Sequence, residues 1–178
     1  MEKQQVSSGK IALNYGLIFG VILIIFSLIL FILDVGIKDM RTWGYVSYVF
    51  IIAGMFLGMK AYRDKTGFLT YGKAFGLGFL ISLYAFIILA IYNYIYFTVI
   101  NPGIVEEILL MAEEQMMETN PNLTDADLET ALAMTKKFTS PLWMTIWGLV
   151  VNAIVGLLLS LIVSLFMVKK ETPAETAA

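Results

Sequence analysis

Four long stretches of the chain contain no Asp, Glu, Lys or Arg, and the charged positions lie between them. The stretches are residues 11–33, 42–59, 74–105 and 138–168. About 20 apolar residues are needed to cross a hydrocarbon core about 30 Å thick, because each helical residue adds about 1.5 Å. The pattern therefore predicts an all-α membrane protein with four transmembrane helices, at about residues 11–33, 42–60, 72–100 and 141–168.

Two of these stretches admit another interpretation. The first follows Lys3 and Lys10 as a signal peptide would, but it is 23 residues long and ends in Asp34-Val35-Gly36, so we expect an uncleaved span. The second has 18 residues, near the lower limit for a span. A re-entrant hairpin is the alternative there.

Composition supports the membrane assignment and narrows the chemistry. Of 178 residues, 59% are hydrophobic and 15% are charged, whereas soluble domains have about 25% charged residues. One polytopic membrane domain covering residues 1–178 accounts for this, with a disordered tail at 171–178. The chain has no Cys and no His, which removes the usual ligands of zinc, haem and iron–sulfur clusters and the base of common catalytic triads. We expect no enzyme activity, no cofactor and no nucleic-acid partner.

The Lys and Arg residues are distributed unequally between the two sides of the membrane that these spans imply. Eight lie at the N-terminus, between spans two and three, and after span four, and four lie in the other two connections. Cytoplasmic loops carry the excess of Lys and Arg. We therefore predict that both termini are cytoplasmic and that the acidic loop between spans three and four is outside.

That loop, residues 101–139, is the only sizeable part between the spans. Asn101-Pro102-Gly103 is expected to break the third helix. Residues 104–119 have an apolar periodicity of three and four, which predicts an amphipathic helix. Thr124 is a natural N-cap for a second helix. The two helices are predicted to form an amphipathic hairpin that buries its apolar stripes against the membrane surface, the bundle or each other.

The acidic residues of this loop are candidate metal ligands. Asp125, Asp127 and Glu129 resemble the start of a calcium loop, but the turn Gly is missing and a helix start favours negative charge. We expect capping there. Three carboxylates of the first loop helix are candidates to meet a partner or a loosely held cation, although an ordinary solvated face would look the same: Glu107, Glu114 and Glu118.

Small residues recur every four positions in the spans. Such rows allow helix backbones to approach closely, although the motif alone is weak evidence. We predict helix packing, more within one chain than between copies of a homo-oligomer, through Gly16, Gly20, Gly54, Gly58, Gly76, Gly78, Gly148, Asn152, Gly156 and Ser160.

Polar and aromatic residues of the spans suggest one alternative function. The rings of an outer aromatic belt are expected at one membrane face, because amphipathic rings settle among headgroups. They are those of Trp43, Tyr45, Tyr92, Tyr94, Tyr96, Trp143 and Trp147. The four charge-free stretches contain no Asp, Glu, Lys, Arg or His, which argues against ion-coupled transport. A small transporter or channel subunit, with Asn93 and Asn152 lining a route, remains the rival hypothesis.

Short motifs spread over the chain resemble an uncharacterised bacterial membrane family, domain of unknown function 4199. They are Ala61-Tyr62-Arg63-Asp64-Lys65, Tyr71-Gly72-Lys73-Ala74, Asn101-Pro102-Gly103, Met111-Ala112-Glu113-Glu114-Gln115-Met116 and Lys136-Lys137-Phe138. The resemblance covers roughly residues 7–170. It implies a four-span inner-membrane protein of Gram-negative bacteria with a helical, here periplasmic, loop between spans three and four, and it implies no activity, substrate or site residue.

The favoured hypothesis is a non-enzymatic scaffold or interaction protein of the inner membrane. Its acidic periplasmic hairpin would contact a protein partner or lipid, and its helices would form a bundle packed through glycines in the bilayer.

Overall fold

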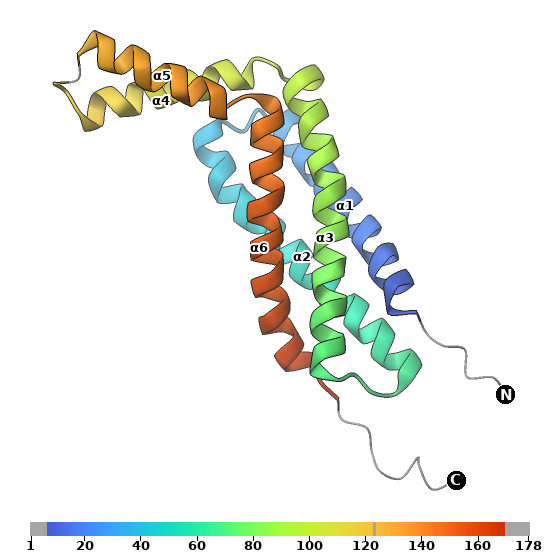
Figure 1. The fold of residues 1–178 in the computed structure, drawn as a ribbon. Coiled ribbons are helices and arrows are strands. Elements are labelled where there is room, and N and C mark those ends of the chain that lie inside the picture. The colour runs from blue at the N-terminus through green and yellow to red at the C-terminus, as the bar shows by residue number, and fades with distance from the viewer. Residues whose placement is uncertain (1–6, 123, 170–178) are drawn as a thin grey trace, which may run out of the picture. The chain divides into compact units, whose positions relative to one another are not determined.

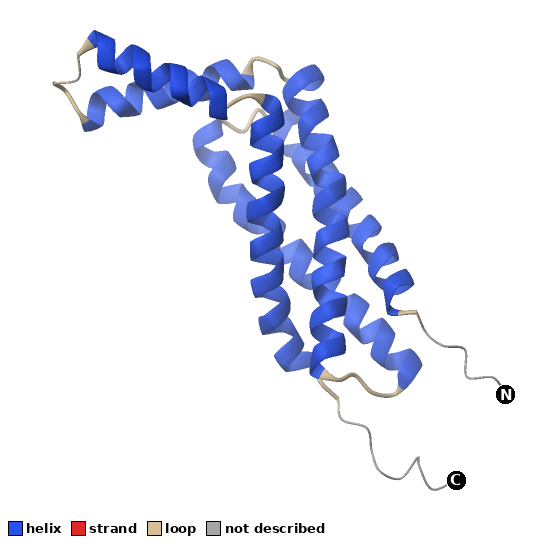
Figure 2. Cartoon of the chain, in the orientation of Figure 1, coloured by secondary structure: helices blue, strands red, loops and turns tan. Residues whose placement is uncertain are grey.

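The chain is almost entirely helical in a computed structural model, which describes residues 7–122 and 124–169 and gives only the backbone of residues 37, 38, 40 and 41. Its elements are α1 (Ser8–Ile32), α2 (Ile37–Thr66), α3 (Tyr71–Ile95), the π-helical turn η1 (Tyr96–Ile100), α4 (Ile104–Thr119), α5 (Asp125–Phe138) and α6 (Pro141–Met167) (Figures 1 and 2). Among the described residues there is no strand beyond a single antiparallel bridge between Leu69 and Lys169. The predicted all-α fold class is confirmed.

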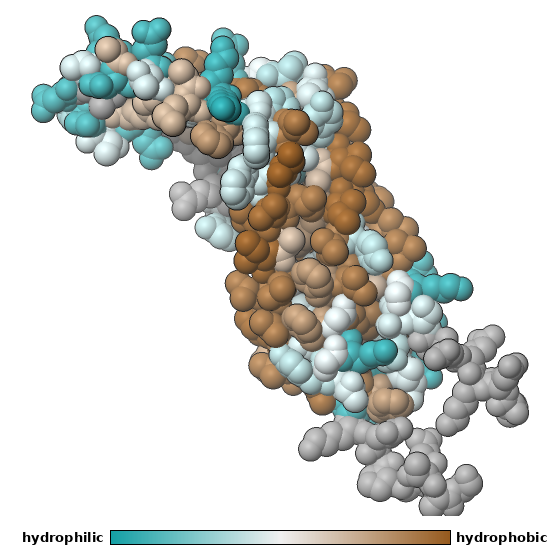
Figure 3. Space-filling model, viewed as in Figure 1, coloured by the Kyte–Doolittle hydropathy of each residue, from teal (hydrophilic) through white to brown (hydrophobic). Residues whose placement is uncertain are grey.

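Four of the helices are long and apolar enough to cross a membrane. Their membrane-compatible parts are Ser8–Ile32, Thr42–Thr66, Tyr71–Ile100 and Pro141–Met167. Apolar residues cover the visible face of these helices in Figure 3, and hydrophilic residues concentrate on α4 and α5. The second helix runs six residues past the predicted span, because charged residues such as Lys60 and Arg63 do not interrupt a helix as Gly or Pro would. The predicted tail at 171–178 lies outside the described residues.

The helix ends follow the local sequence. Ser7 caps α1 by accepting a hydrogen bond from the backbone N–H of Lys10 at 3.4 Å. Thr124 caps α5 in the same way, with the N–H of Asp127 at 3.3 Å, which confirms the predicted N-cap. The second helix ends at Thr66 and is capped by Gly67, whose φ of 82° lies in the left-handed region that favours glycine.

Two compact units make up the chain. The first comprises Met1–Leu89 and Val151–Ala178, and the second comprises Ala90–Val150, so α3 and α6 contribute to both. In the first unit α1 and α2 pack closely together. Its core is formed by Ile11, Ala12, Phe19, Leu23, Ile51, Met55, Met59, Tyr62, Leu69, Ala74, Leu77, Ile81, Ala85, Phe86, Val163 and Met167. The spacing of three and four residues in this set is that of helix faces turned inward.

The second unit holds the loop that links the third and fourth long helices. Tyr92 and Tyr96 are buried in it, with ring centroids 6.0 Å apart. The side-chain amide of Asn101 donates to the hydroxyl of Tyr96 at 3.3 Å. Both rings are therefore packed inside the protein, and their depth in the membrane stays a prediction. Trp43, Trp143 and Trp147, by contrast, are more than 40% exposed.

Candidate functional site

The loop helices α4 and α5 contact each other along their length and are joined by a short turn. The turn follows Thr119, where the N–H of Asn120 bonds to the carbonyl of Met116 at 3.0 Å. Acidic residues occupy the first turn of both helices, and Lys136 and Lys137 occupy the last turn of α5. Each charge complements the helix dipole at its position.

A groove of about 310 Å³ lies between the two helices. It is lined by Glu106, Leu109, Leu110, Glu113, Glu129, Leu132, Ala133 and Lys136. Counted from Glu106 in α4 and from Glu129 in α5, the lining residues of each helix are at positions i, i+3, i+4 and i+7. Each helix therefore presents a single face about two turns long. In each set the middle pair is apolar and the outer pair is charged. The groove therefore has an apolar centre and charged ends.

The groove is lined by more negative than positive side chains. Three carboxylates, those of Glu106, Glu113 and Glu129, line it with one ammonium group, that of Lys136. Because the helices of a hairpin run antiparallel, Lys136 lies toward Glu106, and Glu129 lies toward Glu113. No ion pair within 4.0 Å involves these four residues in the part of the chain that the structure describes. Residues 101–139 carry eight acidic and two basic side chains, a net charge of −6.

The carboxylates singled out from the sequence lie elsewhere on α4. Glu107, Glu114 and Glu118 are exposed, and none of them lines the groove. Within the described residues no three acidic side chains come close enough together to hold a metal ion. The groove carboxylates Glu106 and Glu113 are each one position earlier in the chain. The repeated spacing i, i+3, i+4, i+7 in both helices was the sequence signal that would have identified them.

The hairpin also exposes large apolar side chains. Leu110 is 61% exposed although it lines the groove, and Met134 and Phe138 are 63% and 54% exposed. Apolar surface of this kind, framed by charge, is typical of a surface that binds another molecule.

The predicted packing residues in the first unit lie mostly at close helix contacts. A Cβ atom on Gly16 of α1 would lie 2.6 Å from the Cβ of Tyr84 and 2.9 Å from the carbonyl oxygen of Ile81, both on α3. A Cβ on Gly20 would lie 3.2 Å from the carbonyl oxygen of Ala85. Backbone atoms on the opposite helix cannot move aside easily, so Gly16 cannot be replaced at this separation, whereas Gly20 is at a tight contact that a larger residue would strain.

The glycines of the second helix lie at contacts with both α1 and α3. A Cβ on Gly54 would lie 2.7 Å from the ring of Phe19, and one on Gly58 would overlap the end of the Ile81 side chain. Ring and side-chain atoms are the neighbours here, and Phe19 is buried. A larger residue would therefore have to displace packed core atoms.

The contact between α3 and α6 involves small residues, and some of them are polar. A Cβ on Gly156 would lie 2.5 Å from the hydroxyl oxygen of Ser82, and one on Gly78 would lie 2.6 Å from that of Ser160. Gly76 and Gly148 have no atom within 4 Å of the corresponding position among the described residues. These two glycines are thus in the predicted set but not at a close contact.

The two asparagines of the rival transporter hypothesis have different surroundings. The side-chain oxygen of Asn152 accepts a hydrogen bond from the hydroxyl of Tyr48 at 3.1 Å, which links α6 to α2. Asn93 is half-buried in the second unit. The contact of Asn152 is the interhelical kind that asparagine commonly makes in membranes.

Comparison with known proteins gives one match. The family model described as "Protein of unknown function (DUF4199)" matches residues 14–169. No curated protein and no solved structure matches the chain.

Proposed function

The chain belongs to the DUF4199 family, and we propose that this member is a non-enzymatic interaction protein whose acidic hairpin binds a cationic amphipathic helix of a partner protein. Four long apolar helices make it a multi-pass membrane protein. In this proposal they anchor the hairpin in the inner membrane, with both termini in the cytoplasm and the hairpin in the periplasm. The distribution of Lys and Arg supports that orientation.

The groove between α4 and α5 carries the proposal. Its centre offers Leu109, Leu110, Leu132 and Ala133 to apolar side chains, and its ends offer three carboxylates. An occupant that buries apolar atoms and pairs with those carboxylates must itself combine apolar and basic residues. A helix with Leu-like residues on one face and Lys or Arg beside them has this chemistry.

The length of the groove fits the same occupant. Positions i to i+7 span about 10 Å along a helix, which is two turns. A bound helix would then use anchors at i, i+3 or i+4, and i+7, the usual spacing for helix-in-groove recognition. The negative charge would speed encounter with a basic partner and would make binding sensitive to salt.

Binding of a synthetic peptide to the full chain in lipid nanodiscs tests the proposal. The probe is an 18-residue helical peptide with Lys on one face and Leu on the other. Fluorescence anisotropy measures its binding. E113Q/E129Q removes two groove carboxylates and should weaken binding about fivefold, since partly exposed charge pairs contribute up to about 1 kcal/mol each. E114Q/E118Q removes two carboxylates of the same helix region outside the groove and should leave the affinity within twofold.

Two results would contradict the proposal. Equal weakening by both double variants would mean that only the net charge attracts the peptide. Undiminished binding by L110Q/L132Q, which makes the apolar centre polar, would mean that the peptide does not lie in the groove.

A further inference from the structure

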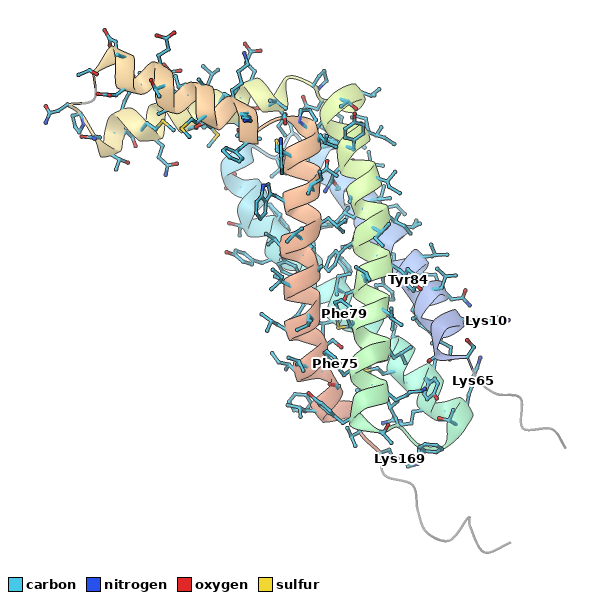
Figure 4. The ribbon with its side chains drawn as sticks, viewed as in Figure 1. Lys10, Lys65, Phe75, Phe79, Tyr84 and Lys169 are labelled. Carbon is cyan, nitrogen blue, oxygen red and sulfur yellow. The ribbon has the colours of Figure 1, made fainter. Side chains whose placement is uncertain are left out.

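Basic side chains gather at one end of the first unit. Helices α1, α2 and α3 and the segment after α6 contribute to this group, which we call the basic rim: Lys10, Lys60, Arg63, Lys65, Lys73 and Lys169. Figure 4 shows Lys10, Lys65 and Lys169 at the same end, where α1 begins and α2 and α6 end. Five of the six are exposed, and Arg63 is half-buried.

Few carboxylates accompany these cations. Of the acidic residues described in the first unit, Asp34 and Asp39 lie at the opposite ends of α1 and α2, and Asp64 alone lies at the basic rim. No ion pair within 4.0 Å occurs at the rim among residues 7–122 and 124–169. The sequence beyond these adds Lys3 and Lys170 and also Glu2, Glu171 and Glu175, so the inference depends on the six described cations.

One part of the rim is held in place by the backbone. The N–H of Leu69 bonds to the carbonyl of Lys169 at 2.9 Å, and the N–H of Lys169 bonds to the carbonyl of Leu69 at 3.0 Å. Leu69 is fully buried, and it is four residues from both Lys65 and Lys73. The bridge therefore joins the connection between α2 and α3, which lies between Lys65 and Lys73 in the chain, to Lys169 after the end of α6.

Exposed apolar residues precede Lys169 in the chain. Leu165 and Phe166 at the end of α6 are 66% and 79% exposed, and Val168 beside Lys169 is 37% exposed. A ligand that covers both surfaces needs an anionic group and apolar chains in one molecule. We propose that Lys65, Lys73 and Lys169, around the Leu69–Lys169 bridge, bind the headgroup of an anionic phospholipid whose acyl chains lie along the end of α6.

A free phosphate ion shares the headgroup chemistry but fits less well. It would satisfy the ammonium groups and leave the side chains of Leu165 and Phe166 uncovered. An anionic lipid is also already concentrated at the membrane surface, whereas free phosphate is not. The negative surface of a leaflet stabilises bound basic segments by about 1 kcal/mol for each Lys or Arg. A phospholipid therefore accounts for the apolar and the basic part together.

A lipid titration of the full chain in detergent, read by native mass spectrometry, tests this site. Phosphatidylglycerol should bind more tightly than phosphatidylcholine with the same acyl chains. The double variant K73Q/K169Q should weaken phosphatidylglycerol binding about 25-fold, which corresponds to about 1 kcal/mol for each lysine. Adding K65Q should weaken it further, and inorganic phosphate at 10-fold excess should not displace the lipid.

The matched control is K10Q/K60Q, which removes two exposed lysines of the same rim that are farther from the bridge in the chain. It should reduce the affinity less than threefold. Equal loss in both double variants would show a diffuse basic surface and overturn the site, and equal binding of both lipids by the native chain would do the same. Displacement by inorganic phosphate would identify the site as one for a free anion and would overturn the lipid assignment.

Two further measurements decide the outcome if the glutamine variants do not fold. K73R/K169R keeps both charges and should retain the phosphatidylglycerol preference. On the unmodified chain, raising NaCl from 50 to 500 mM should reduce that preference at least threefold, because the Debye length falls well below about 10 Å. A preference unaffected by salt would contradict recognition through the lysines.

Discussion

The hydroxyl of Ser160 on α6 donates a 2.7 Å hydrogen bond to the carbonyl oxygen of Phe75 on α3, and 85 positions separate the two residues in the chain. Ser160 has no exposed surface. Figure 4 shows Phe75 on the side of α3 nearest α6. Such a bond is significant among apolar helices, because neither water nor lipid tails can replace it at a buried position.

Replacing Ser160 with Ala should lower the free energy of unfolding by about 0.6 kcal/mol and by no more than about 1.7 kcal/mol, the range of interhelical hydrogen bonds in membranes. Steric-trap unfolding in bicelles measures the difference. Thr130→Ala is the control, because the hydroxyl of Thr130 bonds within α5 to the carbonyl of Ala126 at 2.8 Å. If Ser160→Ala had no greater effect than the control, the bond would not contribute to stability.

Glycines at close contacts should respond differently from glycines with open space around them. Gly16→Ala should destabilise the chain by more than 1 kcal/mol, because its Cβ would meet the backbone of α3 at 2.9 Å. Gly76→Ala and Gly148→Ala should be neutral or stabilising by up to about 1 kcal/mol, since Ala favours a helix and nothing lies within 4 Å among the described residues. Thermal unfolding in one detergent compares the three variants.

Leu at the same positions extends that comparison. Gly16→Leu, Gly54→Leu and Gly156→Leu should prevent normal folding, as judged by monodisperse yield in size-exclusion chromatography. Gly148→Leu is the matched control and should purify like the unmodified chain. Similar yields for all four would contradict the packing described for the first unit.

A double-mutant cycle should detect the hydrogen bond between Tyr48 and Asn152. Tyr48→Phe and Asn152→Ala each remove one partner of the 3.1 Å bond. We expect a coupling energy of about 0.6 kcal/mol. Independent effects of the two substitutions would mean that this contact adds no stability, and would leave the amide of Asn152 available for the rival transporter hypothesis.

Cysteine labelling should place the connection between α2 and α3 and the hairpin on opposite sides of the membrane. Thr70 and Asn120 are both exposed, and the chain has no native Cys. In intact cells an impermeant maleimide should label Asn120→Cys, and it should label Thr70→Cys only after the inner membrane is opened. Labelling of both in intact cells would contradict the proposed topology.

Much of the fold could be predicted because it depends on composition along the chain. Charge-free stretches of sufficient length must become helices in lipid, where each backbone N–H and C=O needs an internal partner. The cap at Thr124 is equally local, since it depends on one side chain and a backbone N–H three residues away. The end of α2 was harder to predict, because the charge-free stretch ends before Lys60 while the helix continues to Thr66.

The candidate site was predicted only in outline. The acidic helical loop follows from the sequence, but the carboxylates that line its groove are Glu106 and Glu113, where the charge pattern favoured Glu107 and Glu114. One position along a helix is a rotation of 100°. A choice between neighbouring carboxylates therefore needs the rotation of α4 against α5, which depends on how Leu109 and Leu132 pack.

The sequence alone thus determined that this protein has four long apolar helices and an acidic helical loop, because helix formation and preference for lipid depend on residues close together in the chain. Only the tertiary structure decided that Gly16 meets the backbone of α3 while Gly76 has no described atom within 4 Å of its Cβ position, and that Lys169 is joined to Leu69. These relationships depend on the rotation and separation of helices distant in sequence, and many side chains together set that geometry.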